Sequence, residues 1–171
     1  MSFLVLGLPR SRTAWLANFL TYDGQFCYHE GVNGCNSIEE YKEKIKGKGD
    51  SNTGLMFFDF EKYFPDTKII IIDSSIEDSV EFGKEVFNLD VSNEMLQGKN
   101  RLDNIKGLHI KLEDINENLK EIWEYVSNKP FDQDRADMLV KLDIKTLNPH
   151  DIDLNALNNF IGNFNASRTL Q

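Results

Sequence analysis

The stretch FLVLGLPRSRTAWLANFL, residues 3–20, decides the fold. Its first four residues form a continuous apolar run that stops at Gly7, which is typical of a buried parallel strand. Residues 11–20 then repeat large apolar side chains at helical spacing. A strand, a short loop and a helix in this order predict the first unit of an α/β fold.

The rest of the chain alternates the same two patterns. Further strands are predicted at 25–28, 68–72 and 108–111, a short strand or turn at 55–60, and helices at 38–46, 76–87, 114–127, 132–142 and 154–161. The polar segment 47–54 is predicted to be a mobile linker, and 88–104 a short helix followed by a loop. We therefore expect a three-layer α/β fold of P-loop type, with a mostly parallel sheet of about four to five strands flanked by helices. The β-branched strand 68–72 should lie in the middle of the sheet.

Length and composition fit one soluble domain. The 171 residues predict a single domain over 1–171, with a core at about 3–145 and a C-terminal helix and tail at 146–171. Hydrophobic residues make up 40% and charged residues 27%, which favours a packed, soluble globule. No apolar run approaches a membrane span, and the start is too short and badly flanked for a signal peptide. We expect a cytoplasmic protein.

The net charge of -9 restricts the partners. An acidic protein repels phosphate at long range, so neither nucleic acid nor an anionic membrane is an expected partner. An anionic ligand must then be held by donors concentrated in one loop. No oligomeric state is predicted.

Such donors gather in GLPRSRTAW, residues 7–15, between the first strand and the first helix. Backbone N–H groups at a helix start attract phosphate, and the loop adds two arginines and two hydroxyls. The predicted anion-binding residues are Gly7, Pro9, Arg10, Ser11, Arg12, Thr13 and Ala14. A nucleotide triphosphatase loop needs a second glycine followed by lysine and Ser/Thr, and here the chain has Arg12, Thr13 and Ala14 instead. A kinase that uses ATP and Mg²⁺ is therefore disfavoured.

Residues 9–15, Pro-Arg-Ser-Arg-Thr-Ala-Trp, resemble the 5′-phosphosulfate loop of the sulfotransferase family, whose usual form is Pro-Arg/Lys-Ser-Gly-Thr-Thr/Ala-Trp. Arg12 departs from the usual glycine and changes the charge of the loop. The resemblance implies sulfuryl transfer from 3′-phosphoadenosine-5′-phosphosulfate (PAPS), with its desulfated product PAP as second ligand. It also implies an unknown small-molecule or protein acceptor and no metal ion.

The second predicted strand ends in FCYHEG, residues 26–31, at the carboxyl edge where ligands bind in open α/β sheets. Transfer to a hydroxyl or amine needs a base, and the resemblance implies that Glu30 is that base and Arg10 a stabiliser of the transferring group. His29 is the second choice as base. A loop carboxylate that only caps the next segment is the alternative for Glu30. Metal ligation by this group, with Cys27 and Cys35, lacks paired zinc spacing, so no metal is predicted.

The second nucleotide contact of the family, an arginine after the central strand and a serine two helical turns later, is not matched. The arginine position holds Ser74, or Asp73 if the register shifts by one. Ser74 and Ser75 are the predicted contacts to the 3′-phosphate, and Ser79 lies close to the later serine position. Ser74 and Ser75 can donate hydrogen bonds but carry no charge. Lys99 and Arg101 are candidate substitute cations, and a plain helix start is the alternative for this stretch.

The resemblance covers roughly residues 3–145. The carboxyl-terminal part matches at the level of the fold, through Leu-Glu-Asp-Ile at 112–115 and Pro-Phe-Asp at 130–132. Arg135 is expected to be a solvated helix residue. The terminal Gly-x-x-Gly-x-x-Lys loop of the family is absent from the sequence, and Gly162 and Arg168 do not reproduce it. The alternative function is therefore a catalytically degenerate P-loop-type protein that binds a nucleotide or a partner.

Overall fold

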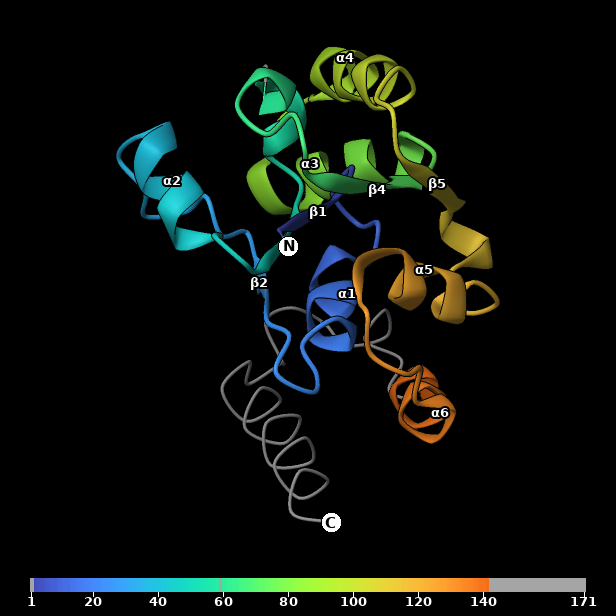
Figure 1. The fold of residues 1–171 in the computed structure, drawn as a ribbon. Coiled ribbons are helices and arrows are strands. Elements are labelled where there is room, and N and C mark those ends of the chain that lie inside the picture. Colours follow the sequence, from blue (N-terminus) through green and yellow to red (C-terminus); the bar gives the residue numbers. More distant parts are fainter. Residues whose placement is uncertain (1, 59, 142–171) are drawn as a thin grey trace.

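The sheet sets the architecture. The computed structural model describes residues 2–58 and 60–141, and its five strands all run parallel in the order β2-β3-β1-β4-β5 (Figure 1). The strands are β1 (Phe3–Gly7), β2 (Cys27–His29), β3 (Gly49–Asn52), β4 (Lys68–Asp73) and β5 (Leu108–Lys111). β1 therefore occupies the centre of the sheet and β4 lies beside it.

Helices cover both faces of this sheet (Figure 1). The α-helices of the described residues are α1 (Thr13–Phe19), α2 (Ile38–Lys44), α3 (Glu77–Phe87), α4 (Ser92–Leu102), α5 (Leu119–Val126) and α6 (Gln133–Lys141). Three short 3₁₀ turns are η1 (Leu55–Phe57), η2 (Phe60–Lys62) and η3 (Leu112–Asp114). None of the described helices combines the length and the apolar character needed to cross a bilayer.

The burial of the central strand shows that a layer of helices covers each face of the sheet. All five residues of β1 are buried, because successive side chains point to opposite faces and each face has its own cover. Phe3 and Val5 pack with apolar residues of α1, α5 and α6. Leu4 and Leu6 pack with residues of α2, η1, η2 and α4. The predicted three-layer α/β class is confirmed, with an entirely parallel sheet.

The segment 47–54 corrects one prediction. It holds β3, an interior strand between β2 and β1, rather than a mobile linker. Its sequence, Gly-Asp-Ser-Asn, is strongly polar, yet all four residues are buried. Gly49 is required because a Cβ there would lie 2.1 Å from Cζ of Phe3. The polar side chains of Asp50 and Asn52 are accommodated because they bond to one another and to neighbours.

Smaller differences have local causes. The 55–60 segment forms 3₁₀ turns rather than a strand, and α4 extends through most of 88–104. The helix predicted over 114–127 begins later, at Leu119, because a 3₁₀ turn at 112–114 and a turn at 115–117 precede it. The strand 68–72 is interior, as expected, but β1 takes the central position. The helix predicted at 154–161 and the tail lie outside the described residues.

Candidate functional site

The phosphate loop, defined as residues 8–12, leaves the carboxyl end of β1 and enters α1. From β1 the chain passes first to β2 and β3 on one side, and later crosses to β4 on the other. Ligands of open α/β sheets bind at such a reversal of strand order, outside the carboxyl ends of the strands. The loop with the predicted anion donors therefore lies at the point of the fold that is best placed for a ligand.

Two loop residues have left-handed backbone conformations. Arg10 has φ 71° and Arg12, which precedes the first turn of α1, has φ 61°. Such residues turn successive backbone N–H groups towards a common point, and these concave arrangements bind anions. Within the described residues no side chain caps α1, which leaves the N–H groups of its first turn to a ligand or to water.

Ser11 fastens the loop from inside. Its hydroxyl donates to the carbonyl oxygen of Leu8 at 2.5 Å and its backbone N–H donates to the same oxygen at 3.1 Å. The residue is fully buried. Gly7 is necessary beneath it, since a Cβ at that position would lie 2.2 Å from the Ser11 Oγ. In this arrangement Ser11 stabilises the loop, and its hydroxyl has to rotate to reach a ligand.

The two arginines differ in placement. Arg10 is exposed, and its guanidinium lies 4.8 Å from the centroid of the Phe82 ring on α3. Arg12 donates to Oδ1 of Asn116 at 2.8 Å and lies 4.4 Å from the Trp15 ring. Arg10 is thus the more accessible of the two cations, whereas Arg12 is held by Asn116 and the Trp15 ring.

His29 ends β2 and Glu30 follows it, at the same edge of the sheet. Nε2 of His29 lies 3.5 Å from Oγ1 of Thr13, at the start of α1, and 3.8 Å from Oε1 of Glu30. Two of the predicted catalytic residues are therefore brought next to the phosphate loop. Ala14 follows Thr13 in the first turn of α1 and, like Pro9, is partly exposed.

A residue that the sequence did not single out holds Glu30. Oε1 of Glu30 accepts hydrogen bonds from the backbone N–H of Thr53 at 2.9 Å and from its Oγ1 at 2.8 Å. Glu30 has φ 54°, and its own N–H donates to the carbonyl oxygen of Ser51 on β3. A carboxylate with two donors and a fixed backbone is oriented rather than free. The signal for Thr53 was hidden because it follows a strand that was predicted to be a linker.

The imidazole of His29 favours its neutral form. Partial burial lowers the pKa of His29, and the nearby carboxylates of Glu30 and Asp50 oppose this effect without cancelling it. A neutral imidazole can accept a proton, so the residue keeps the property required of a second base.

Beneath this edge lies a buried polar network centred on Asp50. Its carboxylate accepts from the Tyr41 hydroxyl at 2.6 Å, from the Gly31 N–H at 2.7 Å and from Nδ2 of Asn52 at 3.2 Å. Burial raises the pKa of Asp50, and these hydrogen bonds lower it in part. Burial, reinforced by Asp50, also raises the pKa of Tyr41. The network joins β3, α2 and the turn after Glu30, and it supports the geometry of the edge.

The other side of the edge, after β4, is acidic. Oδ1 of Asp73, the last residue of β4, lies 3.5 Å from Nζ of Lys99 and 3.4 Å from Nδ1 of His109. Ser74 follows, and its Oγ is buried without a hydrogen-bond partner in the described residues. The hydroxyl of Ser75 bonds to the carboxylate of Glu77. Ser74 and Ser75 thus follow β4 directly, and in the described part of the chain neither is paired with an arginine or a lysine.

The substitute cations and the later serine have other partners. Lys99 also lies 2.7 Å from Asp103, and Arg101 lies 2.9 Å from Glu61. The hydroxyl of Ser79 on α3 donates to the carbonyl oxygen of Pro9 at 2.6 Å, and Ser79 is only 1% exposed. Ser79 therefore ties α3 to the phosphate loop.

Arg135 corrects another expectation, because it is buried at 2% exposure and not solvated. Its guanidinium donates to the carbonyl oxygens of Asn18, Phe19 and Thr21 at 2.8–3.2 Å, at the end of α1. It also lies 4.4 Å from the Tyr22 ring. Its role in the fold is to satisfy the free carbonyls at the carboxyl end of α1 from α6.

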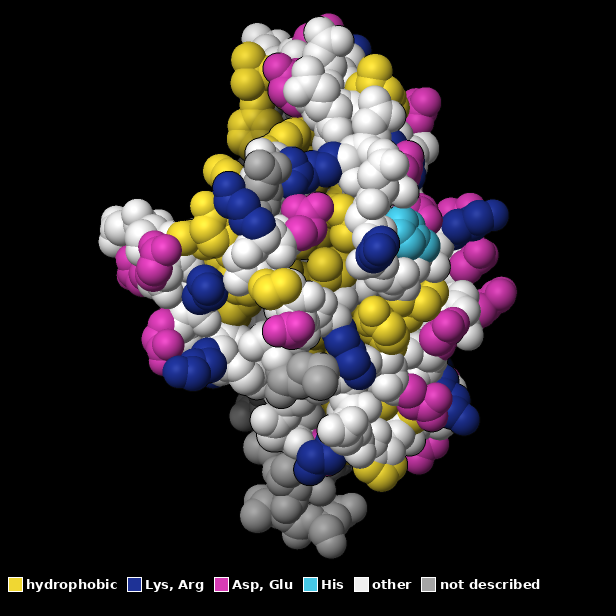
Figure 2. Space-filling model, turned by 45° about the horizontal axis from the view of Figure 1, so that its top comes forward, with side chains coloured by type: hydrophobic (Ala, Val, Ile, Leu, Met, Phe, Trp, Pro, Cys, Tyr) yellow, Lys and Arg dark blue, Asp and Glu magenta, His cyan; other side chains and the backbone are white. Residues whose placement is uncertain are grey.

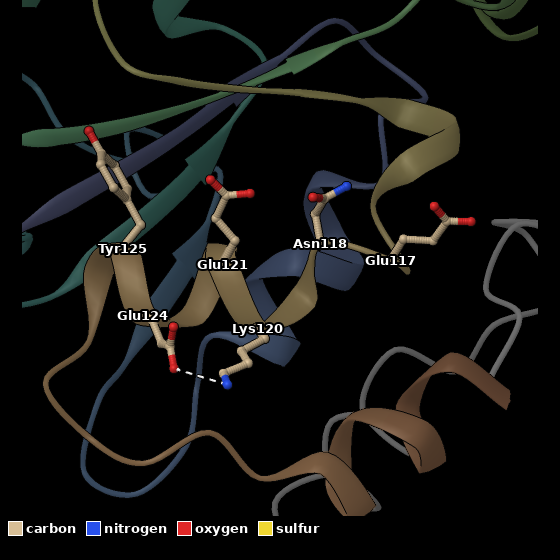
Figure 3. A pocket seen from close by; sticks show the side chains of 6 residues that line it. All are labelled: Glu117, Asn118, Lys120, Glu121, Glu124 and Tyr125. Carbon is tan, nitrogen blue, oxygen red and sulfur yellow. Dashed lines mark ion pairs between the residues drawn. The ribbon is translucent and has the colours of Figure 1, made fainter.

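Two surface hollows lie outside the phosphate loop. One lies along α5 and the turn before it, lined by Glu117, Asn118, Lys120, Glu121, Glu124 and Tyr125 (Figure 3). Three of these side chains are carboxylates, and the single lysine lies 3.8 Å from Glu124. The other hollow is formed by residues 22–23 and 130–134. An acidic lining repels a nucleotide, so we do not assign the ligand to the α5 hollow.

Comparisons with known proteins agree with this fold. No protein-family model matches the sequence, and no curated protein is similar to it. Among solved structures the chain resembles mouse sulfotransferase SULT7A1 complexed with PAP, with a TM-score of 0.56 and 15% sequence identity. The match covers 84% of this chain and 65% of that chain. The chain therefore has a sulfotransferase-like fold, over less than two thirds of the length of that enzyme.

Proposed function

We propose that this protein is a sulfotransferase-like enzyme that moves a sulfuryl group from PAPS to a hydroxyl or amine acceptor. The observation that carries the proposal is the position of the Pro9–Trp15 segment at the carboxyl end of the central strand, beside Glu30 and His29. The solved structure that shares the fold has PAP bound, which supports an adenosine nucleotide as the ligand.

The phosphate loop and the start of α1 are the proposed cradle for the 5′ end of the donor. The backbone N–H groups of this segment supply neutral donors, and Arg10 supplies a reachable charge. The hydroxyl of Thr13 lies between this cradle and His29. We assign Gly7 and Ser11 to the shape of the loop, because both set its backbone.

Glu30 is the proposed base. Oε1 is occupied by Thr53, and Oε2 has no hydrogen bond in the described residues, so we assign Oε2 to take the acceptor proton. In the transfer, a bond forms between the acceptor oxygen or nitrogen and sulfur, the bond from sulfur to the phosphate oxygen breaks, and PAP leaves. Arg10 balances the charge that gathers on the leaving phosphate oxygen. None of these roles requires a metal ion.

The acceptor is a partner of unassigned chemistry, either a small molecule or a side chain of another protein. Nucleic acid is disfavoured by the net charge of -9, and the face in Figure 2 carries acidic and basic side chains mixed together rather than a continuous basic surface. We place the protein in the cytoplasm, which agrees with two cysteines, Cys27 and Cys35, that are both unpaired.

A second candidate is a degenerate P-loop-type protein that binds a nucleotide or a partner without catalysis. The acidic end of β4 favours this candidate, because Asp73 lies at or beside the position where the family has an arginine. The two candidates differ in turnover and share the phosphate loop as a binding site.

A transfer assay separates them. The protein is incubated with PAPS labelled in the sulfuryl group and with phenol, alcohol, amine and carbohydrate acceptors, and labelled product and PAP are measured. Turnover that Glu30→Gln abolishes supports the enzyme, with Glu43→Gln on α2 as a matched control. PAP binding without turnover for any acceptor supports the degenerate nucleotide-binding protein. Absence of both PAP binding and turnover contradicts the enzyme and the PAP-binding form of the second candidate.

A further inference from the structure

The position of the proposed base fixes where the nucleoside lies. His29 ends β2 and Glu30 follows it, on one side of the phosphate loop, while β4 lies on the other side of β1. In an in-line displacement the leaving group departs opposite the attacking atom. A nucleotide held at the loop, with its sulfuryl group towards Glu30, must therefore extend its ribose over the end of β4 and the start of α3.

That region carries an excess of negative charge. Asp73 ends β4, Glu77 and Asp78 occupy the first turn of α3, and Asp103 follows α4. Against these four carboxylates stand two lysines: Lys99, which lies 2.7 Å from Asp103 and 3.5 Å from Asp73, and Lys111, which is paired with Asp73 in the register of β5 with β4. Burial lowers the pKa of Lys99, but Asp103 and Asp73 outweigh this and raise it, so the ammonium is already neutralised by two carboxylates.

The hydroxyl groups of this region are also engaged or enclosed. Ser79 is 1% exposed and donates to Pro9, and the hydroxyl of Ser75 bonds to Glu77. The Oγ of Ser74 is buried. Arg10 leans over Phe82 of α3, but the proposed function uses its charge at the 5′ end of the nucleotide. A doubly charged 3′-phosphate therefore meets carboxylates rather than a bidentate guanidinium.

We propose that the donor site does not select for a 3′-phosphate, and that it accepts an adenosine nucleotide whose 3′ position is a free hydroxyl about as well as PAP. The carboxylate of Asp73 is 28% exposed and can accept a hydrogen bond from a ribose hydroxyl, whereas it repels a phosphate. This inference rests on the proposed function, because it takes the orientation of the nucleotide from the assigned base.

Calorimetry with the full chain tests it, using adenosine 5′-monophosphate and PAP as probes at one salt concentration. We expect the two dissociation constants to differ by less than about tenfold, which is the effect of roughly one charge-assisted hydrogen bond. A preference for PAP of about tenfold or more overturns the inference and leaves the proposed function standing. Absence of binding for both probes overturns the proposed function and the inference with it.

Variants test whether the charges at the end of β4 cause this lack of selectivity for a 3′-phosphate. Asp73→Asn removes a carboxylate and leaves Lys99 paired with Asp103 alone, so it should raise the affinity for PAP several-fold more than the affinity for the monophosphate. Glu85→Gln removes the same charge from the exposed far end of α3 and is the matched control. Ser74→Arg restores a cation and should create a preference for PAP. Equal effects of Asp73→Asn and Glu85→Gln, with no preference gained in Ser74→Arg, overturn the assignment of the 3′ position to this region.

Discussion

Thr53 donates two hydrogen bonds to one oxygen of Glu30, from its backbone N–H at 2.9 Å and from its hydroxyl at 2.8 Å. The two residues belong to turns after neighbouring strands, β3 and β2, and are separated by 23 positions in the sequence. The pairing fixes the carboxylate at the edge of the sheet beside the phosphate loop. The pairing connects the proposed base to β3, a strand that its polar sequence did not predict.

Thr53→Val keeps the shape of the side chain and removes its hydroxyl donor. We expect kcat for sulfuryl transfer to fall about tenfold, since a hydrogen bond to a charged group is worth about 1.5–3 kcal/mol and the backbone bond persists. KM for PAPS should not change, because the hydrogen bonds of Thr53 in the described residues go to Glu30 and not to the phosphate loop. Thr53→Ser should recover most of the rate. Equal losses of rate in Thr53→Val and Thr53→Ser would show that packing, and not the hydroxyl donor, is responsible.

His29 should titrate below its ordinary pKa of 6.5, because partial burial disfavours the charged ring. A lowered pKa in the folded state means that the neutral ring stabilises the fold above 6.5, and that this contribution is lost as the pH falls through 6.5 towards the folded value. The titration of the ring proton by NMR measures this directly. His29→Gln should lessen the loss of stability on acidification, while His109→Gln should retain it. A His29 titration at or above 6.5 contradicts the assignment.

Arg135→Met should destabilise the fold by about 3 kcal/mol, because it leaves three backbone carbonyls at the end of α1 without their charged donor. Denaturant unfolding monitored by tryptophan fluorescence measures the change. Lys120→Met, on the exposed face of α5, is the control and should stay within about 0.5 kcal/mol. Similar losses in the two variants would contradict a structural role specific to Arg135.

Gly7→Ala should displace the phosphate loop, since the added Cβ would lie 2.2 Å from the buried Oγ of Ser11. We expect affinity for PAP to fall about tenfold or more while the chain remains folded. Gly54→Ala adds the same atom near the same edge, where its nearest neighbour is at 3.5 Å, and should bind as the parent does. Calorimetry measures the affinity of both variants for PAP. Equal affinities would show that PAP does not bind at this loop.

The parts of the site that could be predicted are those encoded locally. The loop after β1 is recognisable because strand, donors and helix follow one another within twenty residues, and Glu30 because it directly follows a short strand. Ser79 and Arg135 have side chains that bond to backbone carbonyls far away in the sequence, so their roles depend on how α3 and α6 pack. Neither role leaves a pattern in the residues around it.

The fold shows the same division. β1 and β4 were predictable because a short, continuous apolar run is typical of a strand that is buried on both faces of a parallel sheet. β3 was missed because the burial of Asp50 is compensated by hydrogen bonds from Tyr41 and Gly31, which lie in other segments. Asn52 is satisfied by Asp50 and by the backbone N–H groups of residues 54 and 55. Sequence patterns report the cost of burying a polar group, while the compensating partners become visible only in three dimensions.

The most direct test of the central claim, that the loop after β1 binds the 5′ end of an adenosine nucleotide, is a titration of the isotope-labelled protein with PAP, followed through its backbone amide NMR signals. The account predicts saturable shifts centred on the amides of Arg10, Ser11, Arg12 and Thr13, with smaller shifts at His29 and Glu30. Amides that do not respond at saturating PAP, or shifts confined to the hollow along α5 (Figure 3), would contradict it.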